Sequence, residues 1–263
     1  MTELTSPPEP LPDVSLVMPC YNEERIVAYS IRRLVTAFAR EGYRLELVAV
    51  DNGSSDGTGE ILRGIAARET SVVHHRVDQN RGYGYGVLQG FALCRADWVG
   101  HIPADSQVDA EDVVRLYEAA EISGEQVIAK VRRRFRMDGI DRRLVTLVYN
   151  TMVRMMWPRL PTFDVNAVPK LLPRALLGIL RLESWGWALD PEMMVKAHYL
   201  GVPVLEFNIM SRQRGGGRSH VRVDTGVELL KSLLKLRFSG RIREWRRGLN
   251  PEFGATQRIV ESG

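Results

Sequence analysis

The sequence contains no long hydrophobic run. Nowhere among its 263 residues is there an uninterrupted apolar stretch of the ~18 residues that a membrane-spanning helix requires. The N-terminus, MTELTSPPEPLPD, also lacks the basic and apolar regions of a secretory signal peptide. We therefore expect a cytoplasmic protein in which residues 1–13 form a loose, proline-rich tail.

Cysteine is also scarce, and neither sign of charge dominates. Cys20 and Cys94 are too few for a disulfide framework or a zinc site, so we expect both to be small buried side chains. Hydrophobic residues make up 44% of the chain and the formal net charge is +4, which predicts one globular domain. The basic residues cluster in two segments, 130–136 and 212–247, and these predict an anionic partner.

Strand-like and helix-like segments alternate through the first hundred residues. Apolar runs such as VSLVMP and LELVAVD are each followed by a helical pattern, the first from Ile26 to Arg40. This alternation predicts an α/β fold with a mainly parallel central sheet flanked by helices. The second half is less regular. There we expect a helix from Glu111 to Ile122, a strand QVIAKV, a basic loop, a long helix from about Asp141 to Trp157, and a mixed region through Phe207.

Three turns with acidic residues follow three of the predicted strands. They are PCYNEE at residues 19–24, VDNGSSDGT at 50–58 and IPADSQ at 102–107. Taken singly, each has a structural explanation: capping of the next helix, an Asx turn and an ordinary turn. Because the carboxyl ends of parallel strands meet at one edge of a sheet, the three together predict a ligand site at that edge.

These motifs also carry a resemblance to a known family. VMPCYNEE, VAVDNGSSDGT, NRGYGYGVLQGFALCRADWVGHIPADSQVD and FDVNAVPKLLPR resemble successive motifs of family 2 glycosyltransferases, most closely the branch of dolichyl-phosphate mannose synthase and bacterial polyprenyl-phosphate glycosyltransferases. The resemblance implies a GT-A nucleotide-diphospho-sugar transferase fold over residues 14–222. Residues 223–263 would then form a basic amphipathic helix and tail.

The resemblance assigns roles to individual residues around a nucleotide-sugar donor. Pro19, Tyr21, Glu23 and Asp51 would line the nucleoside pocket. Gly82, at the glycine-rich start of the third helix, would let the backbone approach the nucleotide. The carboxylate of Asp51 suits the imino proton of uracil or of guanine, so UDP-sugars and GDP-sugars both stay open as donors.

A divalent metal, Mg²⁺ or Mn²⁺, is expected at the turn IPADSQ. The family usually has Asp-x-Asp here, followed two residues later by Gln, and in this sequence Pro103 replaces the first acid while Asp105 and Gln107 remain. One carboxylate and one amide suffice if the donor diphosphate and water supply most of about six oxygens. An ordinary turn and a metal-independent variant are the alternatives.

The basic segments suit an anionic acceptor. A phosphate monoester is already ionised at neutral pH and needs only positioning, which Arg132 and Arg134 would provide, while Arg218 in SRQRGGGRSH would close over the donor. Asp190, in WGWALDPEMM, instead favours a hydroxyl acceptor, because hydroxyl-using members of the larger family keep a general base at its position.

We therefore predict an inverting glycosyltransferase that moves a sugar from a nucleotide-sugar donor to a polyprenyl phosphate at the membrane surface. Inversion follows from the resemblance and from the absence of an evident covalent nucleophile. Transfer to a soluble hydroxyl acceptor, such as a natural product or glycan, and nucleotide-sugar binding without turnover are the alternatives. A nucleic-acid partner is not expected, because it would not require a complete nucleotide pocket. The basic tail helix would either contact anionic lipid peripherally or pack on the domain with a solvated basic face.

Overall fold

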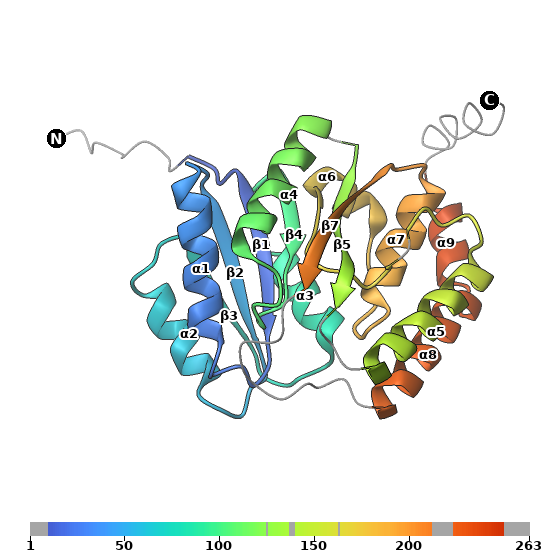
Figure 1. The fold of residues 1–263 in the computed structure, drawn as a ribbon, viewed down its shortest axis with the longest axis horizontal. Coiled ribbons are helices and arrows are strands. Elements are labelled where there is room, and N and C mark those ends of the chain that lie inside the picture. Colours follow the sequence, from blue (N-terminus) through green and yellow to red (C-terminus); the bar gives the residue numbers. More distant parts are fainter. Residues whose placement is uncertain (1–9, 125, 137–139, 163, 212–222, 250–263) are drawn as a thin grey trace.

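The computed structural model describes residues 10–124, 126–136, 140–162, 164–211 and 223–249, and within them the side chains of 133–136, 140–146, 210–211 and 223–227 are not described. In these residues a sheet of seven strands has the order β3-β2-β1-β4-β6-β5-β7 (Figure 1). The strands are β1 (Val14–Cys20), β2 (Leu45–Asn52), β3 (Val72–Val77), β4 (Trp98–His101), β5 (Ile128–Arg136), β6 (Lys170–Pro173) and β7 (Val204–Ser211). The helices are α1 (Val27–Arg40), α2 (Thr58–Ala66), α3 (Tyr83–Phe91), α4 (Ala110–Ser123), α5 (Ile140–Met156), α6 (Arg174–Leu180), α7 (Leu189–Tyr199), α8 (Val223–Phe238) and α9 (Arg241–Arg247).

All strands of this sheet except β6 run in the same direction. β1 is parallel to β2 and β4, β2 to β3, and β5 to β7, whereas β6 is antiparallel to β4 and β5. The carboxyl ends of these strands therefore lie along one edge of the sheet. In Figure 1 this is the lower edge, toward which the arrowheads of β5 and β7 point. The prediction of a mainly parallel α/β sheet is confirmed.

Helices cover both faces of the sheet because the strands are apolar on both sides. Leu16 and Met18 of β1 pack into a core with α1, α2 and α4, whereas Val17 faces a second core that contains α3, α6 and α7. α5, α8 and α9 extend this second layer (Figure 1). Cys20 and Cys94 are free and buried, as expected.

The second half of the chain differs from the sequence prediction in two elements. β5 continues to Arg136, so most of the segment predicted as a basic loop is strand. The tail forms two helices, α8 and α9, because the chain turns at Gly240, whose φ of 82° ends the first helix before the second begins. The predicted domain boundary at residue 222 lies in 212–222, outside the described residues, and stays a prediction.

α8 packs on the domain through one apolar side. Leu229, Leu233 and Leu236 are buried in the core that α5 also enters. Leu234 and Phe238 of the same helix are 38% and 68% exposed. Within the described residues, no helix is long and apolar enough to cross a lipid bilayer.

Candidate active site

The residues assigned to the nucleoside pocket come together where β1 and β2 end. Pro19 lies in β1, with Tyr21 and Glu23 in the turn that follows, and Asp51 lies in β2 directly beside Cys20. This proximity follows from the parallel register of two neighbouring strands, so it is the arrangement that the motif spacing predicts.

Asp51 is fully buried and already engaged at both carboxylate oxygens. Its Oδ1 accepts a hydrogen bond of 2.9 Å from the Ser54 amide, and its Oδ2 accepts one of 3.0 Å from Arg76. The bond to Ser54 is a local turn interaction, although it spans three residues and not the two of the Asx turn given as the structural alternative. Each carboxylate oxygen has a second lone pair, so the side chain keeps the capacity to accept a further donor from a nucleobase.

The acidic turn after β1 does not cap its own helix, contrary to the structural explanation given for it. α1 begins after Ile26 without a side-chain cap. Instead, Asn22 Oδ1 accepts a 2.9 Å bond from the Ser55 amide, and Glu24 Oε2 accepts a 2.9 Å bond from the amide of Gly57, the N-cap of α2. These bonds join the turn after β1 to the turn after β2, and so they stiffen this part of the sheet's carboxyl edge.

Gly82 is required by a contact within the chain. It has a φ of 110°, and a Cβ there would lie 2.6 Å from the carbonyl oxygen of Trp185. That same carbonyl accepts a 2.8 Å bond from the Tyr85 amide, so the start of α3 is fastened to the segment before α7. Asn52 donates a 3.0 Å bond to Gly82 O, while its buried Oδ1 has no partner among the described residues. A contact between Gly82 and the nucleotide stays a prediction.

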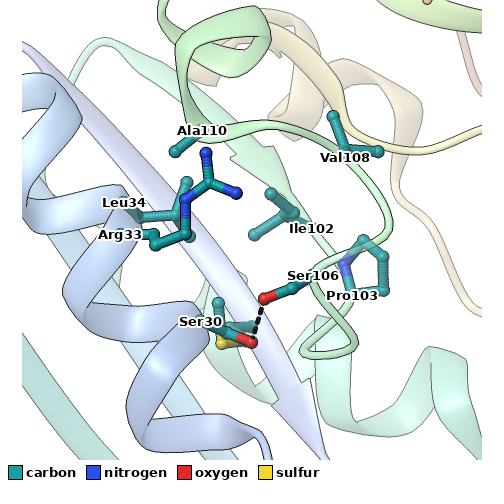
Figure 2. A pocket seen from close by; sticks show the side chains of 9 residues that line it. Ser30, Arg33, Leu34, Ile102, Pro103, Ser106, Val108 and Ala110 are labelled. Atoms are coloured by element: carbon teal, nitrogen blue, oxygen red, sulfur yellow. Dashed lines mark hydrogen bonds between the residues drawn. The ribbon is translucent and has the colours of Figure 1, made fainter. Parts of the chain in front are cut away.

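The turn after β4 is held against α1. Ser30 Oγ donates to Ala104 O over 2.6 Å and lies 2.5 Å from Ser106 Oγ, the contact drawn in Figure 2. Pro103 lines the small pocket between this turn and α1, together with Arg33. The position at which the family usually has its first acid is thus occupied here by an apolar side chain that lines a pocket against α1.

Asp105 and Gln107 remain as candidate metal ligands in this turn. Asp105 is 4% exposed, and its Oδ1 accepts a 3.2 Å hydrogen bond from the backbone N–H of Gln107. Across the part of the chain that the structure describes, no three His, Cys, Asp or Glu side chains gather as a metal site. This donor set fits a divalent ion only if the donor diphosphate and water contribute most of its oxygens.

Asp190 forms a buried network with two residues that the sequence analysis did not select. His101 ends β4 and lies directly opposite Lys170 at the start of β6. Lys170 Nζ donates to Asp190 Oδ1, and His101 Nε2 lies 3.1 Å from the same oxygen. This contact favours a proton on Nε2 and leaves the buried Nδ1 without a partner in the described residues.

The network makes Asp190 a weak proton acceptor. Burial alone would raise the pKa of Asp190, but the charge of Lys170 and the contact with His101 hold it below the ordinary value of a carboxyl group. Burial lowers the pKa of Lys170 to about 8, although the charge of Asp190 opposes this shift. A carboxylate that is buried and ion-paired in this way is poorly suited to take a proton from an acceptor hydroxyl.

The basic residues of β5 lie in different surroundings. Lys130 lies opposite Lys170 and is fully buried, where it donates a 3.0 Å bond to Glu206 of β7. Arg132 is partly exposed and lies two residues nearer to the carboxyl edge of the sheet. The backbone of Arg134 lies at an irregularity in the pairing of β5 with β7, and its side chain is outside the described part. Arg218 is outside the described residues altogether.

Two sequence signals could have revealed the residues that were missed. His101 is a titratable residue at the end of the apolar run WVGHI, and Lys170 directly precedes the apolar pair of VPKLLP. A buried lysine requires a partner, and this requirement points to an acid elsewhere in the chain. The sequence alone could not identify that acid, because Asp190 lies 20 residues from Lys170 and 89 residues from His101 along the chain.

Comparison with known proteins identifies the family. Residues 15–177 match the family model described as Glycosyl transferase family 2. The chain belongs to this family. The matched segment runs from β1 into α6, so it includes the turns after β1, β2 and β4.

Curated relatives of this family 2 member match it over about half of the chain. The undecaprenyl-phosphate 4-deoxy-4-formamido-L-arabinose transferase of Pseudomonas fluorescens (strain SBW25) is 35% identical over 148 residues, which cover 56% of this chain and 43% of the relative. The enzyme of the same name from Pseudomonas aeruginosa (strain LESB58) is 37% identical over 149 residues, with the same coverage. The chain therefore matches less than half the length of these relatives.

Solved structures confirm the GT-A fold. Glucosyl-3-phosphoglycerate synthase from Mycobacterium tuberculosis, in complex with Mn²⁺, UDP and phosphoglyceric acid, superposes with a TM-score of 0.68 at 21% identity, over 86% of this chain and 79% of that one. The same enzyme with Mg²⁺ and UDP gives a TM-score of 0.68 at 20% identity, with the same coverage. At this level of identity the likeness extends to the fold alone.

Proposed function

We propose that this family 2 glycosyltransferase transfers a sugar, with inversion, from a nucleotide-sugar donor to a polyprenyl phosphate at the membrane surface. The names of the curated relatives support a polyprenyl-phosphate acceptor. The observation that carries the proposal is the state of Asp190. Its carboxylate is buried against Lys170 and His101, so the site offers no free base at this position for activating a hydroxyl.

A phosphate acceptor removes the need for that base. Its oxygen is already anionic at neutral pH, so it attacks the anomeric carbon directly once cations have positioned it. Arg132 and Arg134, on the part of β5 that approaches the carboxyl edge, are the proposed phosphate-binding residues. Arg218 is proposed to close over the donor. The proposed catalytic domain spans residues 14–222.

On the donor side, Pro19, Tyr21, Glu23 and Asp51 are proposed to bind the nucleoside of a UDP- or GDP-sugar. Asp105 and Gln107 are proposed to hold Mg²⁺ or Mn²⁺ together with the donor diphosphate. The metal would neutralise the charge that develops on the departing nucleoside diphosphate. Support for this comes from the adjacency of the turns after β1, β2 and β4 at one edge of the sheet.

The first experiment measures release of nucleoside diphosphate. The protein is mixed with Mg²⁺ or Mn²⁺, a panel of UDP- and GDP-sugars, and a polyprenyl phosphate. We expect release with at least one donor only when the lipid phosphate is present. Donor binding without release under every combination would instead show a nucleotide-sugar-binding protein without turnover.

A second experiment distinguishes the two acceptor classes by mutation. With a lipid phosphate, Asp190→Asn should keep most of the turnover of each folded molecule, whereas Arg132→Ala should lose acceptor affinity through a missing charge-assisted contact. With a hydroxyl acceptor the order reverses, and Asp190→Asn falls on the order of a hundredfold. Arg68→Ala, at an exposed arginine after α2, controls for the loss of one positive charge.

A further inference from the structure

A small pocket lies where the end of α5 meets α7, α8 and α9, and its lining includes none of the residues proposed for the carboxyl-edge site. Its lining combines two aromatic rings with three arginines. The aromatic residues are Trp157 and Tyr199, and the arginines are Arg237, Arg243 and Arg246. The residues come from elements that are distant in sequence, so the pocket exists only because α8 and α9 fold back on the domain (Figure 1).

Two of the three guanidinium groups lie over aromatic rings. The centre of the Arg246 guanidinium lies 4.4 Å from the ring of Tyr199, and that of Arg237 lies 5.9 Å from the ring of Trp157. Such stacking fixes the plane of a guanidinium while its N–H donors stay available for a further ligand.

No ion pair between described residues neutralises the positive charge of the pocket. Within the described residues, none of Arg237, Arg243 and Arg246 has a carboxylate within ion-pair distance. The acid nearest in sequence is Glu244, the one acidic residue of α9, which lies beside Gly240 at the pocket. Three arginines against one acid leave a net positive site, and bidentate N–H donors of this kind match phosphate oxygens.

Exposed apolar side chains on the two long helices of this region, α8 and α5, point to the source of the anion. Phe238, the last residue of α8, is 68% exposed, and Leu234 one turn earlier is 38% exposed. On α5, which packs against α8, Met155 is 71% exposed. A free phosphate ion gains nothing from such neighbours, whereas a phospholipid surface offers phosphate groups and a hydrocarbon layer together.

We propose that the arginine pocket between α5, α7, α8 and α9 binds the phosphate headgroup of anionic phospholipid, with Phe238 and Leu234 inserted beside it. It is separate from the carboxyl-edge site and would keep the domain at the bilayer where a lipid-linked acceptor is found. Only the role of holding the enzyme near its acceptor rests on the proposed function. Lipid binding itself is measured without any donor or acceptor.

The test is sedimentation of the full chain with vesicles of phosphatidylcholine alone and of phosphatidylcholine mixed with phosphatidylglycerol. We expect binding to the mixed vesicles only. The triple variant Arg237→Gln/Arg243→Gln/Arg246→Gln should lower the partition coefficient on the order of a hundredfold, as expected for three cations at an anionic surface. The matched control Arg32→Gln/Arg63→Gln/Arg68→Gln removes the same charge from exposed positions on α1, α2 and the segment after α2, and it should change partition by about a fewfold at most.

A second pair of variants tests the contribution of the apolar side chains to vesicle binding. Phe238→Ser should lower the partition coefficient about tenfold, because the variant lacks the aromatic side chain that is inserted into the bilayer on binding. Ile122→Ser, at an 86% exposed position on α4, should leave partition unchanged. Circular dichroism of every variant checks that the fold is retained.

Three results would overturn the proposal. They are equal partition losses in the pocket and control triples, equal binding to vesicles with and without phosphatidylglycerol, and absence of binding to the mixed vesicles, whether or not inorganic phosphate binds to the pocket in solution. A transferase assay with a short, water-soluble prenyl phosphate separates this inference from the proposed function. Pocket variants should keep their activity in that assay, so loss of vesicle binding and loss of transfer are independent outcomes.

Discussion

Lys170 donates a hydrogen bond to Asp190 at a point where both side chains are buried, one at the start of β6 and the other at the start of α7. The pair joins a strand of the sheet to a helix, and His101 completes it from β4. Asp190, which the sequence analysis considered as a general base, is therefore occupied as the partner of a buried cation. This arrangement connects the fold to the choice of acceptor.

Removing the charge of one member of the pair should destabilise the fold. Removing both charges should destabilise it by less than the two single losses together. Asp190→Asn leaves Lys170 buried without its counter-charge, so we expect the free energy of unfolding to fall by about 3 to 5 kcal/mol. Lys170→Met combined with Asp190→Asn should fall by less than the sum of the single losses. Urea unfolding of the four proteins gives the coupling, and strictly additive losses would show that the pair does not interact.

The same pair predicts a change of stability with alkaline pH. Burial lowers the pKa of Lys170 from 10.5 to about 8, so between these values the unfolded chain binds a proton that the folded chain has released. Stability therefore gains a contribution as pH rises through this window, up to about 3 kcal/mol in total. Lys170→Met should lose that contribution. Unfolding curves at pH 8 and near pH 10.5 test it, and equal pH dependence in both proteins would contradict it.

Asp105→Asn should abolish transfer and weaken the metal-dependent part of donor binding. An amide cannot offset the charge of a divalent ion, and this turn offers one carboxylate. Donor titrations with and without Mg²⁺ or Mn²⁺ measure the difference. Asp109→Asn is the control, because that acid lies four residues later and pairs with Arg33 on α1. Turnover near that of the wild type in Asp105→Asn would remove the metal role.

Asp51→Ala should raise the Michaelis constant for the donor by removing a charge-assisted contact of roughly 1.5 to 3 kcal/mol. The substitution also frees Ser54 and Arg76, so a loss of fold must be distinguished from a loss of binding. Arg76→Gln makes that distinction, because it breaks the ion pair while the carboxylate stays. If both variants raise the constant equally, Asp51 supports the turn and does not contact the donor.

The first half of the fold could be predicted because its signals are local. Alternation of apolar runs and helical patterns from Val14 to His101 fixed the order of strands and helices, and parallel strands bring the ends of β1 and β2 together without further information. The turns at 19–24 and 50–58 were located correctly for the same reason. The hydrogen-bond partners of their side chains were not predicted correctly, because Glu24 bonds the amide of Gly57 in the neighbouring turn.

The second half resisted prediction because its interactions are long-range. Arg132 reads as part of a charged loop, yet β5 continues through it since β7 pairs along its length. The four residues of β6 carry no pattern of their own, and their antiparallel position between β4 and β5 depends on the whole sheet. Only three-dimensional packing shows that Lys170 and Asp190 neutralise each other.

The most direct test of the account compares two acceptors that differ in one group. The wild-type protein is given donor, divalent metal and either a prenyl phosphate or the matching prenyl alcohol, and released nucleoside diphosphate is measured. Because Asp190 is held by Lys170, we predict turnover with the phosphate and none above background with the alcohol. Turnover with the alcohol that equals or exceeds turnover with the phosphate would contradict the account.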